Sequence, residues 1–171
     1  REELKLRAKK LKEKGVVAGL GVILVGEDPA SVSYVTAKAK AAEEIGIFEE
    51  TVHLPGDASE EEILKNVDRL NSDQRFHGVL VQLPLPKWVN PDKVINFISP
   101  EKDVDGFHPV NVGKLLRGEP CPLPCTPYGI QQMLVRSGYS PEGQHVVICG
   151  RSNIVGKPLA ALLLQKKPGA N

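Results

Sequence analysis

The sequence lacks several features that would assign it to a class at once. Its longest apolar run, residues 158–164, is far shorter than the roughly 20 residues that cross a bilayer. Its net charge is only +1, so no polyanionic partner such as nucleic acid is indicated. Three cysteines, an odd number in unlike contexts, favour a reducing compartment over a disulfide framework. Membrane proteins, nucleic-acid-binding proteins and disulfide-rich secreted domains are therefore disfavoured.

What is present is an ordinary globular composition. Hydrophobic residues make up 41% and charged residues 25% of 171 residues, enough for one full domain and part of a second. The chain opens at Arg1 inside a helical pattern and stops in a turn at residues 167–171. We therefore expect a fragment, or the ordered part, of a longer protein.

Short apolar strands alternate with capped helices. Strands are expected at residues 19–26, 51–54 and 79–84, and helices at 1–14, 29–45, after Ser59, at 91–98 and at 110–116. Asp28 before Pro29 and Ser59 before three glutamates are typical N-caps. This alternation predicts an α/β fold with a parallel βαβαβ sheet and right-handed crossovers.

A second domain is expected to begin after a proline-rich hinge at residues 121–127. Thr126 is the expected N-cap and Pro127 the first residue of a linking helix that Gly138 closes. A fresh strand at 144–149, with Cys149 in the core, then leads into a glycine turn and a helix. We therefore divide the chain into a catalytic domain, 1–125, and the linking helix with the start of a Rossmann dinucleotide-binding domain, 126–171.

The spacing of Cys121 and Cys125 raises the question of zinc. No second pair of ligands with metal-like spacing accompanies them, so no metal site is expected.

Gln82 is the polar residue in the apolar run 79–84, just before Pro84 ends the strand. Ligands bind at the carboxyl ends of strands in open α/β sheets, so this amide is a candidate site residue. A Gln that merely caps backbone groups at a strand end fits the pattern equally well.

Tyr34 and Lys38 lie four residues apart and hence on one face of the expected helix 29–45. Small alanines surround Lys38, and a lysine held in a cleft would have its charged form disfavoured, which suits acid–base chemistry. Tyr34 offers a ring for stacking and a hydroxyl. The alternative is a solvated surface lysine.

Asp103 and Asp105 share one short acidic loop. A carboxylate beside a glycine can accept two N–H bonds from a flat amino-pyrimidine edge, whereas an Asx-type turn satisfies its own backbone. We assign the turn to Asp103 and the ligand to Asp105, which precedes Gly106.

The turn at residues 150–156 resembles one that seats a pyrophosphate on a helix N-terminus. It departs from G-x-G-x-x-G, because Ser152 replaces the second glycine and the last glycine comes one position late. A structural glycine turn is therefore an equally good interpretation.

Taken together, the motifs make the chain similar to the bifunctional methylenetetrahydrofolate dehydrogenase/methenyltetrahydrofolate cyclohydrolase family. The matching segments follow the family's order and cover nearly the whole chain: 34–38 with 41–47, 78–86, 100–108, 124–127 and 150–156. The resemblance implies a folate-binding catalytic domain that faces a Rossmann domain.

The resemblance also implies roles for individual residues. Lys38 would be the catalytic lysine, and Tyr34 would stack on and orient the substrate. Gln82 would hydrogen-bond Lys38 and help tune it, while Asp105 would hold the amino-pyrimidine edge of the pterin.

Two linked reactions follow from the resemblance. Hydride would pass from methylenetetrahydrofolate to a nicotinamide, and water would then open the methenyl cation to 10-formyltetrahydrofolate. Gly150, Arg151, Ser152 and Val155 would line the dinucleotide pocket. Because a guanidinium directly after the glycine suits a 2′-phosphate, NADP is favoured over NAD.

The remaining expectations concern partners and setting. The family suggests a homodimer that uses tetrahydrofolate derivatives, with no nucleic acid or membrane partner. Cytoplasm is the expected location, and the mitochondrial matrix is an alternative. The family continues with more of the Rossmann sheet and a glycine-proline-rich loop, so we expect this chain to keep the folate half of the site and to bind NADP poorly.

Two other functions compete with this one. Two-domain dehydrogenases of the shikimate or amino-acid type share the layout but do not account for Gln82 and Asp105 together. A folate-binding or scaffolding fragment without activity is the non-enzyme alternative.

Overall fold

The computed structural model describes residues 1–166 and 169–170, which form two compact units, Arg1–Lys102 and Asp103–Asn171. Most of the turn expected at residues 167–171 lies outside the described residues. The two units meet between residues 102 and 103, whereas we expected the catalytic domain to end at residue 125. The expected division into a catalytic and a dinucleotide-binding domain stays a prediction.

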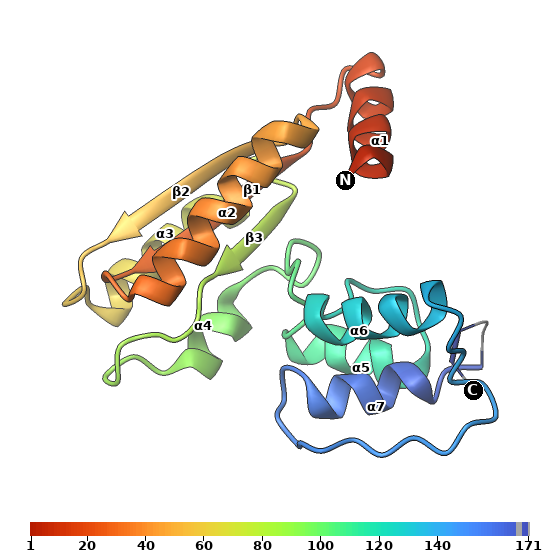
Figure 1. The fold of residues 1–171 in the computed structure, drawn as a ribbon. Coiled ribbons are helices and arrows are strands. Elements are labelled where there is room, and N and C mark those ends of the chain that lie inside the picture. The colour runs from red at the N-terminus through yellow and green to blue at the C-terminus, as the bar shows by residue number, and fades with distance from the viewer. Residues whose placement is uncertain (167–168, 171) are drawn as a thin grey trace. The chain divides into compact units, whose positions relative to one another are not determined.

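The first unit is built on a parallel sheet. Strands β1 (Gly19–Val25), β2 (Phe48–Leu54) and β3 (Gly78–Val81) lie in the order β2-β1-β3 (Figure 1). In the register, Val22 of β1 lies opposite Thr51 on one side and Leu80 on the other. The predicted parallel sheet is confirmed, although β3 ends at Val81, earlier than expected.

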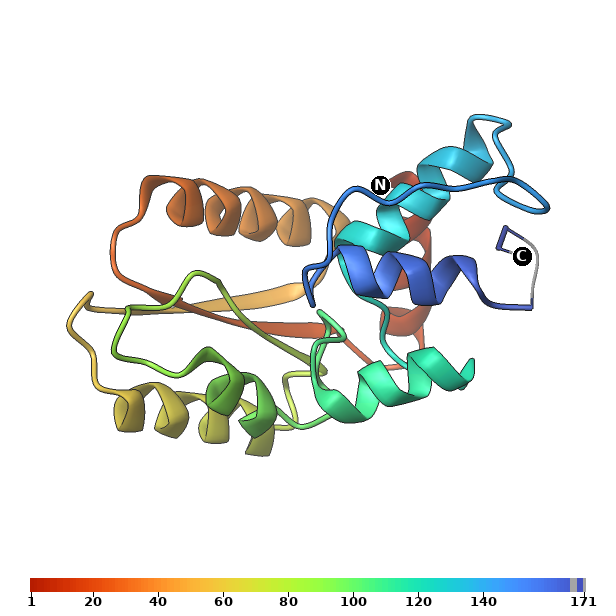
Figure 2. The same cartoon turned by 90° about the horizontal axis from the view of Figure 1, so that it is seen from below.

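Helices cover both faces of this sheet. α2 (Pro29–Ile45) lies on one face, and α3 (Glu60–Ser72) and α4 (Pro91–Phe97) lie on the other (Figure 2). The main core lies on the α3 and α4 side, where apolar side chains of both helices meet those of the strands. Its most buried members include Ile23, Ile63, Val67, Leu70, Phe76, Val79 and Val94.

The caps expected for the helices at 29–45 and after Ser59 are confirmed. The carboxylate of Asp28 accepts the backbone N–H of Ser31 at 2.8 Å, and this hydrogen bond lowers the pKa of Asp28. The hydroxyl of Ser59 accepts the N–H of Glu62 at 3.1 Å. Gly46 ends α2 with a φ of 81°, a left-handed conformation that suits glycine. These caps fix where α2 and α3 begin relative to the strands.

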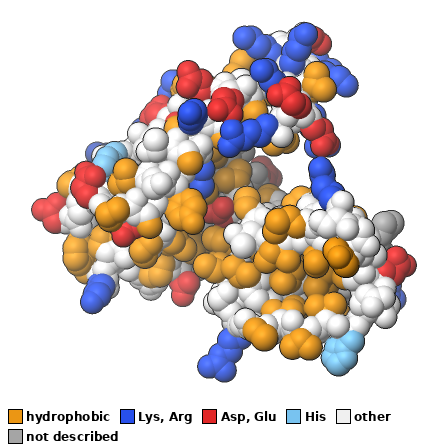
Figure 3. Space-filling view, viewed as in Figure 1, with side chains coloured by type: hydrophobic (Ala, Val, Ile, Leu, Met, Phe, Trp, Pro, Cys, Tyr) orange, Lys and Arg blue, Asp and Glu red, His pale blue; other side chains and the backbone are white. Residues whose placement is uncertain are grey.

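Helix α1 (Glu2–Glu13) has no buried residue. Its basic side chains gather on the surface in Figure 3, and Leu4, Leu6 and Leu11 are also exposed. An ion pair of 2.6 Å from Arg1 to Glu44 links α1 to α2. The helix therefore contributes little to the core.

None of the described helices is long and apolar enough to cross a membrane.

In the described residues the second unit is helical. It contains α5 (Pro109–Arg117), α6 (Cys125–Arg136) and α7 (Gly156–Leu163), with α7 in contact with both others. The buried Gln165 just after α7 donates its amide N–H to the carbonyls of Leu115 and Ala161, at 2.8 and 2.9 Å. This side chain therefore ties the end of α7 to the end of α5.

The strand expected at residues 144–149 is wrong. This segment carries no strand assignment, and Val146, Val147 and Cys149 are exposed. A strand exists only through backbone hydrogen bonds to a neighbour, and no described segment of the second unit provides one. The expected core position of Cys149 is therefore wrong as well, because this cysteine is exposed.

The expected start of the linking helix is also wrong. α6 begins at Cys125 with Pro124 as its N-cap, so Thr126 lies inside the helix and Pro127 is buried in its first turn. Proline is tolerated there because the first N–H groups of a helix have no intrahelical acceptor. The expected end is confirmed, since Gly138 follows the last turn with a φ of 82°.

Candidate functional site

Lys38 and Gln82 meet at the carboxyl end of the sheet. The Nζ of Lys38 donates to Oε1 of Gln82 at 2.7 Å, and Nε2 of Gln82 donates to the carbonyl of Leu83 at 2.7 Å. The second bond fixes the amide so that its oxygen faces the ammonium. The hydrogen bond implied by the family resemblance is therefore present, while the catalytic roles of both residues stay predictions.

Backbone structure places both side chains. The N–H of Gln82 donates to the carbonyl of Ile23 at 2.9 Å, which extends the β1–β3 ladder beyond the end of β3. Lys38 lies in the middle of α2, which packs on the strands. Lys38 is half-buried, so it is neither a fully solvated surface lysine nor an enclosed one. The pair thus stands on a strand end and a helix, both rigid elements.

Tyr34 lies one helical turn before Lys38 on α2. Its side chain is 65% exposed, so a flat ligand can reach the ring from solvent. Its role in stacking stays a prediction.

The segment after Gln82 is anchored by the only tryptophan in the sequence. The indole N–H of Trp88 donates to the carbonyl of Ala58 at 3.3 Å, and the side chain is nevertheless 62% exposed. The next residue, Val89, is buried in the core. The loop beside the candidate site is therefore held at two adjacent positions. Trp88 was not among the predicted site residues, although it is the single aromatic residue in the segment 82–90 that follows the strand.

In the second unit, Asp103 is buried, with only 1% of its surface exposed. Its Oδ2 accepts the N–H of His108 at 2.8 Å and the side-chain amide of Asn111 at 2.9 Å. This carboxylate holds its loop to the first turns of α5, a structural role as expected, but across more residues than an Asx turn spans.

Asp105 is half-buried in the same loop. Gly106 beside it has a φ of +64°, and a Cβ at this position would lie 2.7 Å from the carbonyl oxygen of Pro122. Only glycine fits this close approach without strain, so the backbone beside Asp105 is tightly defined. Binding of a pterin by Asp105 stays a prediction, since Asp105 belongs to the second unit and Lys38 to the first.

The glycine turn before α7 is compact. A Cβ on Gly156 would lie only 2.3 Å from the carbonyl oxygen of Gly150, so glycine is required for this approach. The hydroxyl of Ser152 accepts the N–H groups of Val155 and Gly156, at 3.1 and 3.3 Å. Ser152 thus occupies amides that could otherwise face a phosphate. The neighbouring Arg151 is exposed.

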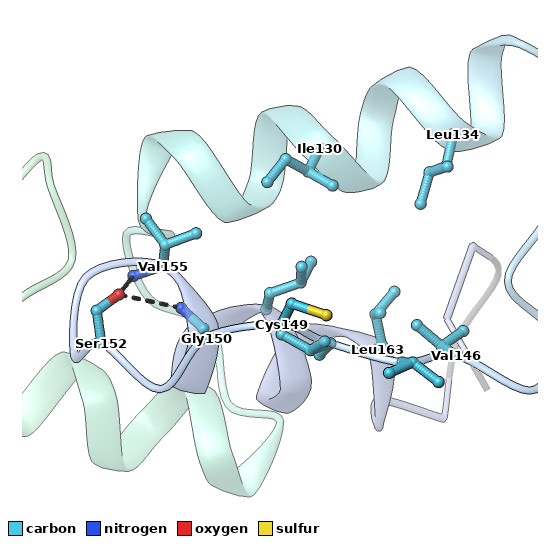
Figure 4. A pocket seen from close by; sticks show the side chains of 12 residues that line it. Ile130, Leu134, Val146, Cys149, Gly150, Ser152, Val155 and Leu163 are labelled. Carbon is cyan, nitrogen blue, oxygen red and sulfur yellow. Dashed lines mark hydrogen bonds between the residues drawn. The ribbon is translucent and has the colours of Figure 1, made fainter.

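An apolar cavity of about 410 Å³ lies beside this turn, between α6, residues 146–152 and α7 (Figure 4). Ile130 and Leu134 line it from α6, and Leu159 and Leu163 line it from α7. Gly150, Ser152 and Val155 of this lining were predicted as site residues, whereas these four side chains were not. Their spacing of four residues on each helix was a signal that could have identified a shared apolar face.

No group of three or more His, Cys, Asp or Glu side chains able to hold a metal ion occurs in residues 1–166 and 169–170. Cys125, which the spacing had raised as a candidate ligand, donates its thiol to the carbonyl of Val104 at 3.7 Å.

Comparisons with known proteins place this geometry in a family. The family model described as tetrahydrofolate dehydrogenase/cyclohydrolase, catalytic domain, matches residues 1–105, and the one described as the NAD(P)-binding domain of the same enzymes matches residues 124–170. The bifunctional protein FolD of Dehalococcoides mccartyi is 56% identical over 172 residues, covering all of this chain and 58% of the relative. The chain therefore spans little more than half the length of such relatives.

Solved structures agree with this result. FolD of Campylobacter jejuni, a methylenetetrahydrofolate dehydrogenase/cyclohydrolase, matches with a TM-score of 0.92 and 48% identity over 95% of this chain and 58% of that one. The Trypanosoma brucei enzyme, solved with NADP cofactor and an inhibitor, matches with a TM-score of 0.92 and 36% identity over 99% of this chain and 59% of that one. The chain belongs to the tetrahydrofolate dehydrogenase/cyclohydrolase family.

Proposed function

We propose that the protein carrying this chain interconverts one-carbon units on tetrahydrofolate. It would oxidise methylenetetrahydrofolate to methenyltetrahydrofolate with NADP and hydrolyse the product to 10-formyltetrahydrofolate. The observation that supports this most directly is the 2.7 Å hydrogen bond between Lys38 and Gln82 at the carboxyl end of the sheet. Relatives that are named as bifunctional dehydrogenase/cyclohydrolase enzymes support it further.

The hydrolysis needs little from the protein besides position and one proton carrier. The methenyl carbon is already electrophilic, so water adds to it and forms a carbinol with release of a proton. The bond from this carbon to one ring nitrogen then breaks, that nitrogen takes up a proton, and the carbinol oxygen loses one to become the formyl group. Lys38 would carry these protons at Nζ, with the Gln82 oxygen holding its position.

Tyr34 and Asp105 complete the proposed folate site. Tyr34 presents an exposed ring on the same helix face as Lys38, which suits stacking on a flat heterocycle. Asp105 would accept N–H bonds from the amino-pyrimidine edge. Each of these roles is part of the proposal.

The residues of the turn before α7 fit a dinucleotide in part. NADP, when bound, would accept the hydride from methylenetetrahydrofolate. No atom lies within 4 Å of where a Cβ on Gly150 would be, so a ligand can approach this glycine closely, and the exposed Arg151 suits a 2′-phosphate. Ser152 and Val155, whose hydroxyl and N–H are hydrogen-bonded to each other, would line the dinucleotide pocket at this turn. Because Ser152 already occupies the amide of Val155, phosphate binding at these amides would require the hydroxyl to move.

A hydrolysis assay tests the proposal. Methenyltetrahydrofolate loses its absorbance when it is opened, so its decay with the 171-residue chain is compared with spontaneous decay. We expect faster decay with the chain, and a fall of about 10²–10⁴-fold in the catalysed rate for Lys38→Met. Lys40→Met is the matched control, because Lys40 is an exposed lysine of the same helix.

The outcomes separate the alternatives. Catalysis that persists in Lys38→Met contradicts the role of Lys38. Binding of the folate without catalysis by the wild-type chain favours a folate-binding fragment without activity.

We also propose a homodimer, since β2 lies at the edge of the described sheet and an open strand edge can pair with a second copy. Light scattering of the purified chain distinguishes one copy from two. A cytoplasmic location, with the mitochondrial matrix as the alternative, stays a prediction.

A further inference from the structure

Lys102 is held by an unusual set of hydrogen bonds. Its Nζ donates to the backbone carbonyls of Leu70, Asn71 and Asp73, at 3.1, 2.7 and 2.9 Å. Since α3 ends at Ser72, these are carbonyl groups at the helix C-terminus, which lack intrahelical donors and carry partial negative charge. All three donors of the ammonium are therefore used on one helix end.

The backbone of Lys102 is fixed as well. Its carbonyl accepts the N–H of Val79 at 2.7 Å, and its N–H donates to the carbonyl of Ser99 at 2.8 Å. Val79 belongs to β3, whose other side pairs with β1. Lys102 is thus attached to a helix end and to a strand at the same time, and it is the last residue of the first unit.

This attachment lies three residues from two proposed ligand-binding side chains. Gln82 follows Val79 by three residues, and Asp105 follows Lys102 by three residues. Three residues of extended chain span at most about 10 Å. The short segment that carries Asp105 therefore begins at Lys102, and Lys102 is attached to β3, the strand that leads to Gln82.

We propose that Lys102 is a positioning residue for the folate, which acts through Asp105 by fixing where the loop leaves the first unit. This inference rests on the proposed function. A side chain that only stabilised the fold would change the stability of the protein, whereas a positioning residue changes the affinity for the folate as well and does so only while Asp105 is present.

The test is a double-mutant cycle on the 171-residue chain, with methenyltetrahydrofolate as the probe. We expect Lys102→Met, which keeps the apolar stem and loses the three donors, to raise KM about tenfold and to leave kcat nearly unchanged. Asp105→Ala alone is expected to raise KM at least as much. The double variant is expected to show the KM of Asp105→Ala and no further rise, because the two residues act in series.

The matched control is Lys93→Met. Lys93 pairs with Glu60 in the same unit, at the other end of α3, rather than with the carbonyls that Lys102 binds. We expect it to leave KM unchanged. Should Lys102→Met fail to fold, Lys102→Gln, which retains two N–H donors without the charge, takes its place with a smaller rise in KM.

An unchanged KM in the Lys102 variant overturns the inference, and so does a double variant whose KM is the product of the two separate effects. Failure of the proposed function looks different: the wild-type chain then neither binds nor hydrolyses the folate, and the positioning role falls with it.

Discussion

The two units of this chain differ in how completely their elements are paired. In Arg1–Lys102, each strand has a neighbour, helices cover both faces of the sheet, and the candidate catalytic pair stands at a strand end. In Asp103–Asn171, the apolar segment 144–149 has no strand partner in the described residues, and an apolar cavity lies beside it. Hydrophobic side chains are visible on the surface of this second unit in Figure 3. The difference teaches that hydrogen bonds between neighbouring strands hold the Lys38–Gln82 site in place. The glycine turn, in contrast, follows a segment that no described strand pairs with.

The largest effect should come from a break in the paired unit. Ile63 of α3 is fully buried in the core, so Ile63→Ala is expected to lower the free energy of unfolding by about 2–5 kcal/mol. Val147→Ala is the control in the unpaired segment, where the side chain is 75% exposed, and a change within about 0.5 kcal/mol is expected. Urea unfolding measures both. Equal losses for the two variants would mean that the units do not differ in packing as described.

The second prediction concerns the catalytic pair. Gln82→Leu removes the oxygen that accepts the Lys38 ammonium at 2.7 Å, and hydrogen bonds to charged groups contribute about 1.5–3 kcal/mol. We expect the hydrolysis rate to fall about 10- to 100-fold. Gln74→Leu, at an exposed glutamine before β3, should leave the rate unchanged. A Gln82→Leu rate equal to that of the wild type would show that the bond does not position Lys38.

A smaller effect is expected in the glycine turn. Ser152→Ala removes the hydroxyl that accepts the N–H groups of Val155 and Gly156, so the start of α7 should lose about 0.5–2 kcal/mol of local stability. Amide hydrogen exchange at these two positions should quicken. Ser140→Ala is the control, since the Ser140 hydroxyl accepts the N–H of Glu142 in the segment that follows α6. Unchanged exchange in Ser152→Ala would mean that the turn is held by its backbone alone.

The smallest effect is a dependence on pH in the first unit. Hydrogen bonds from the Arg75 side chain and backbone lower the pKa of Asp73 to about 2. A lowered pKa means that the charged carboxylate stabilises the fold above its unfolded pKa of about 3.9, and that this contribution is lost as the pH falls toward 2. In Asp73→Asn the midpoint of urea unfolding should therefore change less between pH 4 and pH 2 than in the wild type. An equal change in both proteins would contradict this pairing.

Much of the first unit could be predicted because its signals are local. Asp28 and Ser59 cap their helices with their own side chains, and Gly46 ends α2 by its own backbone freedom. Gln82 and Lys38 could each be predicted as candidate site residues from the sequence. Gln82 is a polar residue at the end of a buried strand, and Lys38 is a lysine among alanines on a helix. That they would meet came from the family resemblance.

The rest could not be predicted because it depends on distant partners. Apolar residues at 144–149 indicate that a segment can be buried, but they do not supply the neighbouring strand that makes it a strand. Lys102 is similar: its ammonium binds the end of α3, about thirty positions earlier, and nothing in its own surroundings in the sequence indicates that.

Trp88 gives the chain a built-in optical reporter. It is the only tryptophan in the sequence, it lies in the first unit near Gln82, and most of its indole is open to solvent. Selective excitation of the indole therefore records the environment of that unit alone. Far-ultraviolet circular dichroism records the helices of both units, so a melt followed by indole emission and one followed by circular dichroism would coincide only if both units unfold in one step.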